Sequence, residues 1–137
     1  MTRSSSHPFF QEDYIGSDYY GSASTAYQYL MIAHDKGVTA STGRTRYEPG
    51  NTVIVSARSQ NGNIYGFLGI AQEVLDETAD KFWGGPQNGR PVNKIEVVTP
   101  ITYIPDELYT QPGLAGFQVE DREKIAEHLM KYVPVTA

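Results

Sequence analysis

The sequence predicts one α+β domain built on a strongly curled, mostly antiparallel β-barrel of roughly five or six strands, with short helices and a longer C-terminal helix. Three observations predict this fold class. Short runs rich in β-forming residues alternate with turn residues. One of these runs contains two glycines, which is typical of a sheet that curls. The C-terminal segment switches to helical periodicity, and a length of 137 residues suits a single domain.

Composition excludes several classes of protein. The chain has no cysteine, which excludes disulfide frameworks, cysteine zinc sites and thiolate nucleophiles. Its formal net charge of −5 argues against a protein that coats nucleic acid by charge alone. No apolar run is long enough to span a bilayer, and the first residues lack the apolar core of a signal peptide. We therefore expect a cytoplasmic protein with no membrane partner.

Tyrosine dominates the aromatic residues, with 10 of them in the chain. A tyrosine ring combines a large apolar face with a polar tip, so it suits half-buried strands and binding surfaces alike. A structural role in strands is the first interpretation of this excess, and a binding surface is the second.

Residues 1–26 predict an N-terminal arm, followed by a domain over residues 27–137. The arm has many serines and little periodicity, but it also carries five aromatic residues, which disordered segments normally lack. These are Phe9, Phe10, Tyr14, Tyr19 and Tyr20. We expect the arm to be pinned by these rings on the domain or on a second subunit, which predicts a homo-oligomer through residues 1–26.

The first predicted strand is Tyr27–His34, because it is rich in aromatic and aliphatic residues and ends at the turn signal Asp35-Lys36-Gly37. A polar connection over residues 38–48 follows. Pro49-Gly50-Asn51 then predicts a turn before a second strand over residues 52–58.

Asn61-Gly62 predicts a hairpin, because this dipeptide readily adopts the positive φ angles of a type I′ turn. The returning strand over residues 64–74 contains Gly66 and Gly69. Glycines inside a strand indicate a bulge or a corner, so we expect the sheet to curl here towards a barrel.

The second half of the chain predicts shorter elements. Residues 76–83 predict a helical turn capped by Asp76, and residues 94–99 predict a strand. Pro100 places the continuation, residues 101–104, at a sheet edge. Pro105 and the two acids after it suit the first turn of a helix.

The C-terminal helix is predicted over residues 120–133. Ile125, Leu129 and Tyr132 fall at helical spacing, and they form one apolar stripe. Acids occupy the first turn and a lysine the last, as the helix dipole favours.

The stretch from residue 49 to residue 104 resembles the PUA-like superfamily, and within it the EVE domain, with the YTH and ASCH domains as relatives. The matching residues are the Pro49-Gly50 turn, the apolar strand 52–56, the small-residue strand 65–74, Phe82-Trp83, the strand 95–98 and the prolines Pro100 and Pro105. Ser59 alone matches the aromatic-His-Ser run that often ends the corresponding strand in EVE domains. Residues 42–46 depart from the family, which has an Asn-containing basic segment there.

The resemblance implies a pocket at the mouth of the barrel that holds a modified or flipped-out base between aromatic faces. Stacking of this kind is worth about 1–3 kcal/mol per base. The candidate ligand-binding residues are Tyr29, Tyr65, Trp83 and Tyr103 as ring platforms, Arg44, Arg46 and Arg58 as phosphate partners, and Ser59. The predicted function is a non-catalytic recognition module for nucleic acid or a nucleotide-like ligand, with no cofactor and no metal.

Two alternatives stay open. The first is a structural or interaction protein that oligomerises through its aromatic arm. The second is a small enzyme in which His34 and Asp35 act as a base or as metal ligands. The glycine-rich segment 84–91 lacks the Gly-Lys-Ser/Thr of a phosphate-binding loop, and no serine lies in a nucleophile elbow.

Overall fold

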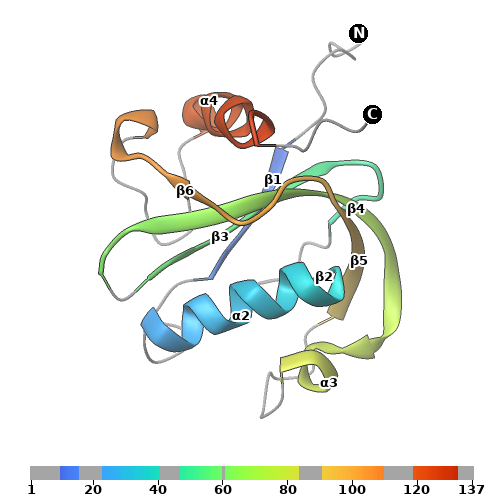
Figure 1. Ribbon diagram of the computed structural model, residues 1–137. Helices are drawn as coiled ribbons and strands as arrows, with labels where there is room; N and C mark the ends of the chain where they lie inside the picture. The colour runs from blue at the N-terminus through green and yellow to red at the C-terminus, as the bar shows by residue number, and fades with distance from the viewer. Residues whose placement is uncertain are drawn as a thin grey trace, which may run out of the picture.

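A computed structural model describes residues 10–15, 23–40, 47–59, 61–83, 91–109 and 119–132 of the chain. It has three layers, in which helix α2 covers one face of a mostly antiparallel sheet and helix α4 covers the other (Figure 1). The predicted α+β class is therefore confirmed. The strands are β1 (Phe10–Ile15), β2 (Val38–Ala40), β3 (Thr52–Arg58), β4 (Ile64–Thr78), β5 (Pro91–Val97) and β6 (Thr102–Ile104). The helices are α2 (Ala23–Lys36), α3 (Ala79–Trp83), the 3₁₀ turn η1 (Asp106–Leu108) and α4 (Val119–Met130).

The sheet is open, which corrects the prediction of a closed barrel. Its strand order is β1-β3-β4-β5-β2, and β6 pairs with the start of β4. Only β1 and β3 run parallel among the pairs of the described strands. No pairing of the described residues joins β1 to β2, so these two strands stay at separate edges. The predicted curl is present in β4, which bends along its length (Figure 1).

The prediction of a strand over Tyr27–His34 is wrong, because these residues lie inside α2. Ala26, Leu30 and Ala33 are fully buried, and their spacing of four and three residues is that of one helix face. The tyrosines of this segment favoured a strand by propensity, but packing of the small-residue stripe on the sheet decides the structure. The predicted turn follows the helix, where Gly37 has a φ of 68° and its N–H donates to the carbonyl of Ala33.

The predicted hairpin after β3 is confirmed. β3 and β4 pair antiparallel from Thr52↔Ile70 to Arg58↔Ile64, and Gly62 has the expected positive φ, 88°. The connection spans residues 59–63, so it is longer than the two residues of a type I′ turn.

The glycines of β4 allow a close approach of strands and do not mark the bend. A Cβ on Gly66 would lie 2.7 Å from the carbonyl oxygen of Val55. The pairing of β4 with β5 instead shifts register after Ala71 and again after Val74. At this bend the buried side-chain amide of Asn93 donates to the carbonyl of Gln72.

Other boundaries differ from the predictions by a few residues. β4 continues through Asp76 to Thr78, so the predicted helical turn is shortened to α3. The connection expected after Gly37 contains β2, and β5 begins already at Pro91. The predicted C-terminal helix is confirmed as α4, which ends at Met130.

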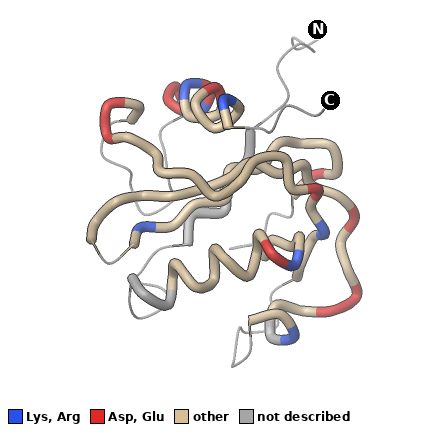
Figure 2. Tube along the Cα trace, in the orientation of Figure 1, with Lys and Arg blue, Asp and Glu red and all other residues tan. Residues whose placement is uncertain are grey.

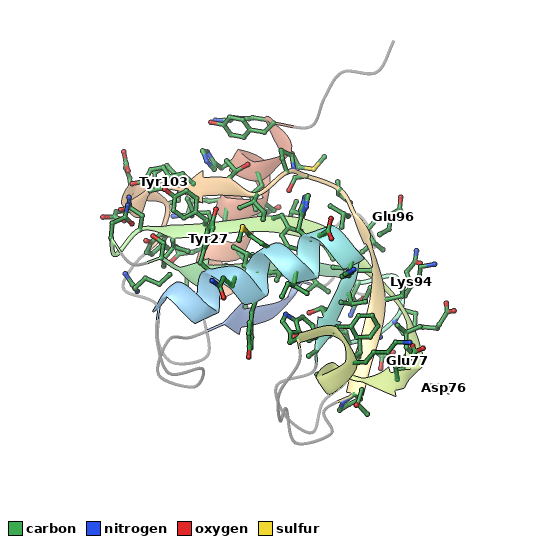
Figure 3. All side chains as sticks on the ribbon, turned by 60° about the horizontal axis from the view of Figure 1, so that its bottom comes forward. Tyr27, Asp76, Glu77, Lys94, Glu96 and Tyr103 are labelled. Carbon is green, nitrogen blue, oxygen red and sulfur yellow. The ribbon has the colours of Figure 1, made fainter. Side chains whose placement is uncertain are left out.

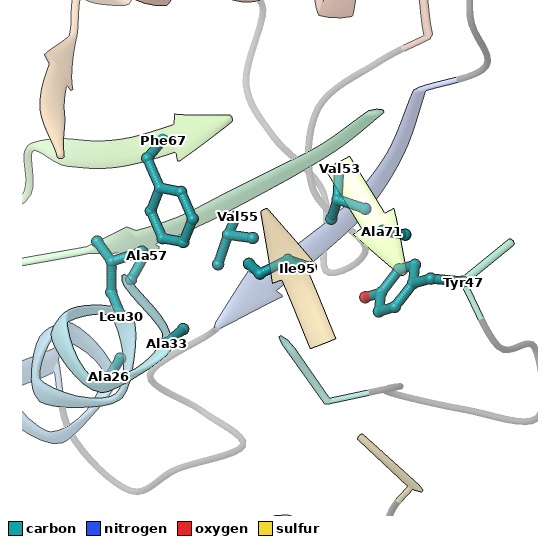
Figure 4. Packing of buried hydrophobic residues seen from close by; sticks show 10 residues of the cluster. All are labelled: Ala26, Leu30, Ala33, Tyr47, Val53, Val55, Ala57, Phe67, Ala71 and Ile95. Atoms are coloured by element: carbon teal, nitrogen blue, oxygen red, sulfur yellow. The ribbon is translucent and has the colours of Figure 1, made fainter. Parts of the chain in front are cut away.

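The core lies on both faces of the sheet. On the α2 side, Val53, Val55 and Ala57 of β3 pack with Leu30 and Phe67 (Figure 4). On the other side, Ile54 belongs to a cluster with residues of α4. Because both faces of β3 are covered, residues 53–57 are all buried, and all of them except Ser56 are apolar.

Part of the predicted N-terminal arm belongs to the sheet. Phe10–Ile15 form β1, which pairs in parallel with β3 from Phe10↔Thr52 to Ile15↔Ala57. Helix α2 begins at Ala23, and the other residues of the 1–26 segment lie outside the described part of the chain. Across the described ranges, no helix has both the length and the hydropathy needed to cross a bilayer.

Candidate functional site

Three tyrosines from three different elements meet at one end of the sheet, and we call them the tyrosine surface. Tyr27 comes from α2, Tyr65 from β4 and Tyr103 from β6. The ring centroids of Tyr27 and Tyr65 are 5.5 Å apart with planes at 78°. Those of Tyr65 and Tyr103 are 5.8 Å apart with planes at 58°. These edge-on and tilted contacts are favourable arrangements for aromatic pairs.

Strand register brings Tyr65 and Tyr103 together. The two residues are directly opposite each other in the antiparallel pair of β4 and β6, so their side chains lie on the same face. Tyr103 is 40% exposed, whereas Tyr65 and Tyr27 are half-buried. Figure 3 shows Tyr27 and Tyr103 on the same side of the molecule. The surface therefore presents one accessible ring supported by two others.

Helix α4 fixes the edge strand that carries Tyr103. The Nε2 of His128 lies 2.9 Å from the carbonyl oxygen of Tyr103. A carbonyl only accepts, so this ring nitrogen carries the hydrogen and donates. Pro100 and Pro105 flank the short strand, and such features limit pairing of a sheet edge with another chain.

Arg58 and Ser59 shape the hairpin loop at the end of β3. Arg58 pairs with Ile64, which packs in the α4-side cluster, so Arg58 lies on the face of the sheet opposite to Tyr65. Its Nη1 donates to the carbonyl of Gly62 at 2.8 Å. The Ser59 hydroxyl bonds Asn61 and the carbonyl of Asn63. The Arg58 bond uses one of the five N–H groups of a guanidinium, and the hydroxyl of Ser59 is engaged within the loop.

Tyr109, which was not among the residues predicted for the site, lies in the same region. The hydroxyl of Tyr109 donates to Oδ1 of Asp106 at 3.0 Å. Burial first, and then the Asp106 carboxylate, raise the pKa of Tyr109 to about 12, against the opposing charge of Arg58. The phenol therefore stays protonated at neutral pH. The Asp106-x-x-Tyr109 spacing, which brings residues i and i+3 together in a 3₁₀ turn, was the sequence signal for this pair.

Tyr29 and Trp83 form a separate aromatic group. The indole Nε1 of Trp83 donates to the carbonyl of Tyr29 at 3.0 Å, and their ring centroids are 6.2 Å apart. This contact attaches α3 to α2. Trp83 follows the far end of β4, whereas Tyr65 lies near its start. The structure thus divides the predicted ring platforms into two groups. Arg44 and Arg46 lie outside the described residues.

The histidine of the enzyme hypothesis makes contacts inside the fold. Nε2 of His34 lies 3.3 Å from the carbonyl oxygen of Thr99, and its ring meets Phe67 edge-on at 4.9 Å. Asp35 is exposed on the next position of α2, where helix geometry turns successive side chains apart. Among the described residues, no three His, Asp or Glu side chains gather in a way that could hold a metal ion.

Charges of both signs are spread over the molecule. Figure 2 shows Asp and Glu on η1, on α4 and on the outer part of β4, with Lys and Arg scattered between them. The charged residues that follow Tyr103 along the chain are the acids Asp106 and Glu107. The site therefore offers ring faces and single polar groups rather than a basic field.

No family model, no curated protein and no solved structure matches the chain. What the site can do chemically is therefore argued from its own residues. An accessible phenol ring supported by two further tyrosines is suited to stacking against a flat ligand.

Proposed function

We propose that the protein is a non-catalytic recognition module that binds a nucleobase or nucleotide-like ligand on its tyrosine surface. The observation that carries this proposal is the cross-strand pair of Tyr65 and Tyr103, in which the outer ring is 40% exposed. The pair is preorganised, because Tyr65 and the His128 bond hold Tyr103 in place. A base stacked on such a ring gains about 1–3 kcal/mol.

The charges favour a ligand bound through its base. Arg58 pairs with Ile64 and so leaves the sheet on the face opposite to Tyr65, and the acids Asp106 and Glu107, which follow β6, oppose a phosphate backbone. The net charge of −5 also opposes binding of a long phosphate backbone. We therefore expect binding that depends only weakly on salt, unlike the steep dependence of proteins that neutralise many phosphates.

A PUA-like relationship is part of this proposal. It is supported by the antiparallel order of β3, β4 and β5 and by the bend of β4. In this view the hydrogen bond from Trp83 to Tyr29 attaches α3 to α2 at the far end of the sheet. Trp83 then has a structural role and does not take part in ligand binding.

Binding of nucleosides and short single-stranded oligonucleotides, followed by tyrosine fluorescence and calorimetry, tests the proposal. Tyr103→Ala is expected to weaken binding by about tenfold or more, since a lost stack of ~1.4 kcal/mol is a factor of ten. Tyr103→Phe keeps the ring and is expected to bind normally. Tyr132→Ala is the matched control, because Tyr132 is also an exposed tyrosine, at 49%. An equal loss of affinity in Tyr132→Ala, or no loss of affinity in Tyr103→Ala, would refute a stacking site at Tyr103.

A structural or interaction role remains the second candidate, and one observation favours it. β1 comes from the aromatic N-terminal segment and lies at the edge of the sheet, paired only with β3 among the described strands. A strand held in this way could be contributed by a second copy. Sedimentation velocity of the full chain over a wide concentration range tests this role, and a monomer at every concentration would contradict it.

A further inference from the structure

Tyr65 and Tyr103 have the arrangement required for an oxidative cross-link. The residues are directly opposite on β4 and β6, and their ring centroids are 5.8 Å apart. Opposite residues of an antiparallel pair have Cβ atoms only about 4.5–5.5 Å apart. The two phenols therefore leave the sheet side by side with their rings tilted by 58°, and the bond requires each ring to turn until the carbons next to the hydroxyls meet.

Accessibility and composition favour oxidation at this pair. Tyr103 is 40% exposed, so an oxidant in solution can reach its ring. The chain has no cysteine to consume oxidising equivalents. The ring contact lets Tyr65, which is half-buried, pass an electron to an oxidised Tyr103.

We propose that Tyr65 and Tyr103 are a modification site, at which a haem peroxidase and hydrogen peroxide produce an intramolecular dityrosine. Each phenol loses one electron and one proton to become a phenoxyl radical. The two radicals form a carbon–carbon bond between ring positions next to the hydroxyls, and the displaced ring hydrogens return to the oxygens. The two electrons and two protons reduce one hydrogen peroxide to two waters. This site goes beyond the proposed function and does not depend on it.

Other aromatic pairs are less suited to the same bond. Tyr27 meets Tyr65 nearly perpendicular, at 78°, and its backbone belongs to a helix in another layer. Tyr132 is 49% exposed, but its ring contact is with His128, which cannot form a dityrosine. Tyr29 faces Trp83 and the other end of the sheet.

The cross-link would have a structural consequence. It would join β6 covalently to β4 and close the chain between residues 65 and 103, which restricts the unfolded state in the way a disulfide does. Since β6 is a short edge strand, a covalent bond there is expected to raise the melting temperature of the modified chain.

The test treats dilute full-length protein with a haem peroxidase and hydrogen peroxide and then isolates the monomer. The expected product shows dityrosine fluorescence, and after digestion one peptide pair joins residues 65 and 103 with the loss of two hydrogen atoms. Tyr65→Phe and Tyr103→Phe keep their rings, and each is expected to abolish the signal in the monomer. Tyr132→Phe and Tyr27→Phe are matched controls that are expected to retain it.

Three results would overturn the proposal. The monomer could carry no dityrosine, the link could join other residues, or Tyr103→Phe could keep the emission. Circular dichroism of each variant before oxidation separates a lost site from a lost fold. Ligand binding by the unoxidised protein is measured independently, so failure of the cross-link and failure of the proposed function are distinguishable.

Discussion

The side-chain amide of Asn93 donates to the carbonyl oxygen of Gln72 at 2.7 Å, where β4 leaves its regular register with β5. The same amide also donates to the carbonyl of Tyr47 at 3.1 Å, and Asn93 is fully buried. A bend interrupts the ladder of backbone hydrogen bonds, so buried carbonyls there need another donor. Asn93 supplies a hydrogen-bond donor to two carbonyls at this bend.

Asn93→Ala is expected to destabilise the protein, because it removes both hydrogen bonds that this buried amide donates. The expected cost is about 1–3 kcal/mol for each carbonyl that stays buried and unpaired. Urea unfolding measures the difference. Lys94→Ala, at an exposed position of the same strand, is the control, with an expected change within about 0.5 kcal/mol. Equal unfolding free energies for the two variants would show that the amide does not hold the bend.

Gly66→Ala is expected to be more destabilising than Gly69→Ala. A Cβ at Gly66 would lie 2.7 Å from a backbone oxygen of β3, whereas at Gly69 the nearest atom is the side-chain Cδ1 of Ile95, at 3.2 Å. Overpacking that moves the backbone costs roughly 1–3 kcal/mol. Thermal unfolding of both variants checks the order, and the reverse order would mean that β3 and β4 separate easily at Gly66.

Leu129→Ala is expected to cost about 2–5 kcal/mol, as for other large-to-small changes in a core. Leu129 belongs to α4 and is fully buried, in the cluster that also contains Ile54 of β3. Met130→Ala is the neighbouring control, because Met130 is 49% exposed. Chemical denaturation compares the two. A similar small effect for both would mean that α4 does not pack on the sheet.

Ionisation of the Tyr109 phenol is expected to lower the free energy of unfolding at alkaline pH. Its pKa is raised to about 12 by burial and by Asp106, above the value near 10 of an unfolded tyrosine. Below about pH 10 the phenol is protonated in both states, and its contribution is fully present. Between about pH 10 and pH 12 only the unfolded state loses the proton, so the free energy of unfolding falls.

Nuclear magnetic resonance of the labelled Tyr109 ring measures this pKa directly. Asp106→Asn is expected to lower the pKa of Tyr109, because it replaces a carboxylate that opposes the phenolate. Tyr109→Phe is expected to reduce the loss of stability in alkali. An unchanged pKa in Asp106→Asn would assign the whole shift to burial.

Elements defined by local signals could be predicted from the sequence. The β3–β4 hairpin follows from the turn at Asn61-Gly62, and α4 follows from the spacing of Ile125 and Leu129. Helix α2 could not be predicted in this way. Its buried stripe contains Ala26 and Ala33, whose weak hydrophobic signal is outweighed by the strand propensity of the tyrosines beside them.

The candidate site shows the same division between local and long-range information. Tyr65 and Tyr103 were singled out by residue type, but only the register of β4 with β6 makes them neighbours. Trp83 was placed in the same site because the resemblance to EVE domains puts a tryptophan-bearing segment next to this strand. The strand continues to Thr78, which carries Trp83 to the opposite end. Closure of the sheet likewise depends on pairings between distant segments, which no local pattern specifies.

The parallel pairing of β1 with β3 sets an order on how the molecule assembles. The six residues of β1 are made early, yet their partner strand starts only at Thr52, beyond α2 and β2. During synthesis the first strand must therefore wait, unpaired, until that later segment has emerged. This border of the sheet is thus completed by a segment that precedes its partner strand in the chain and can dock only after that partner has been made.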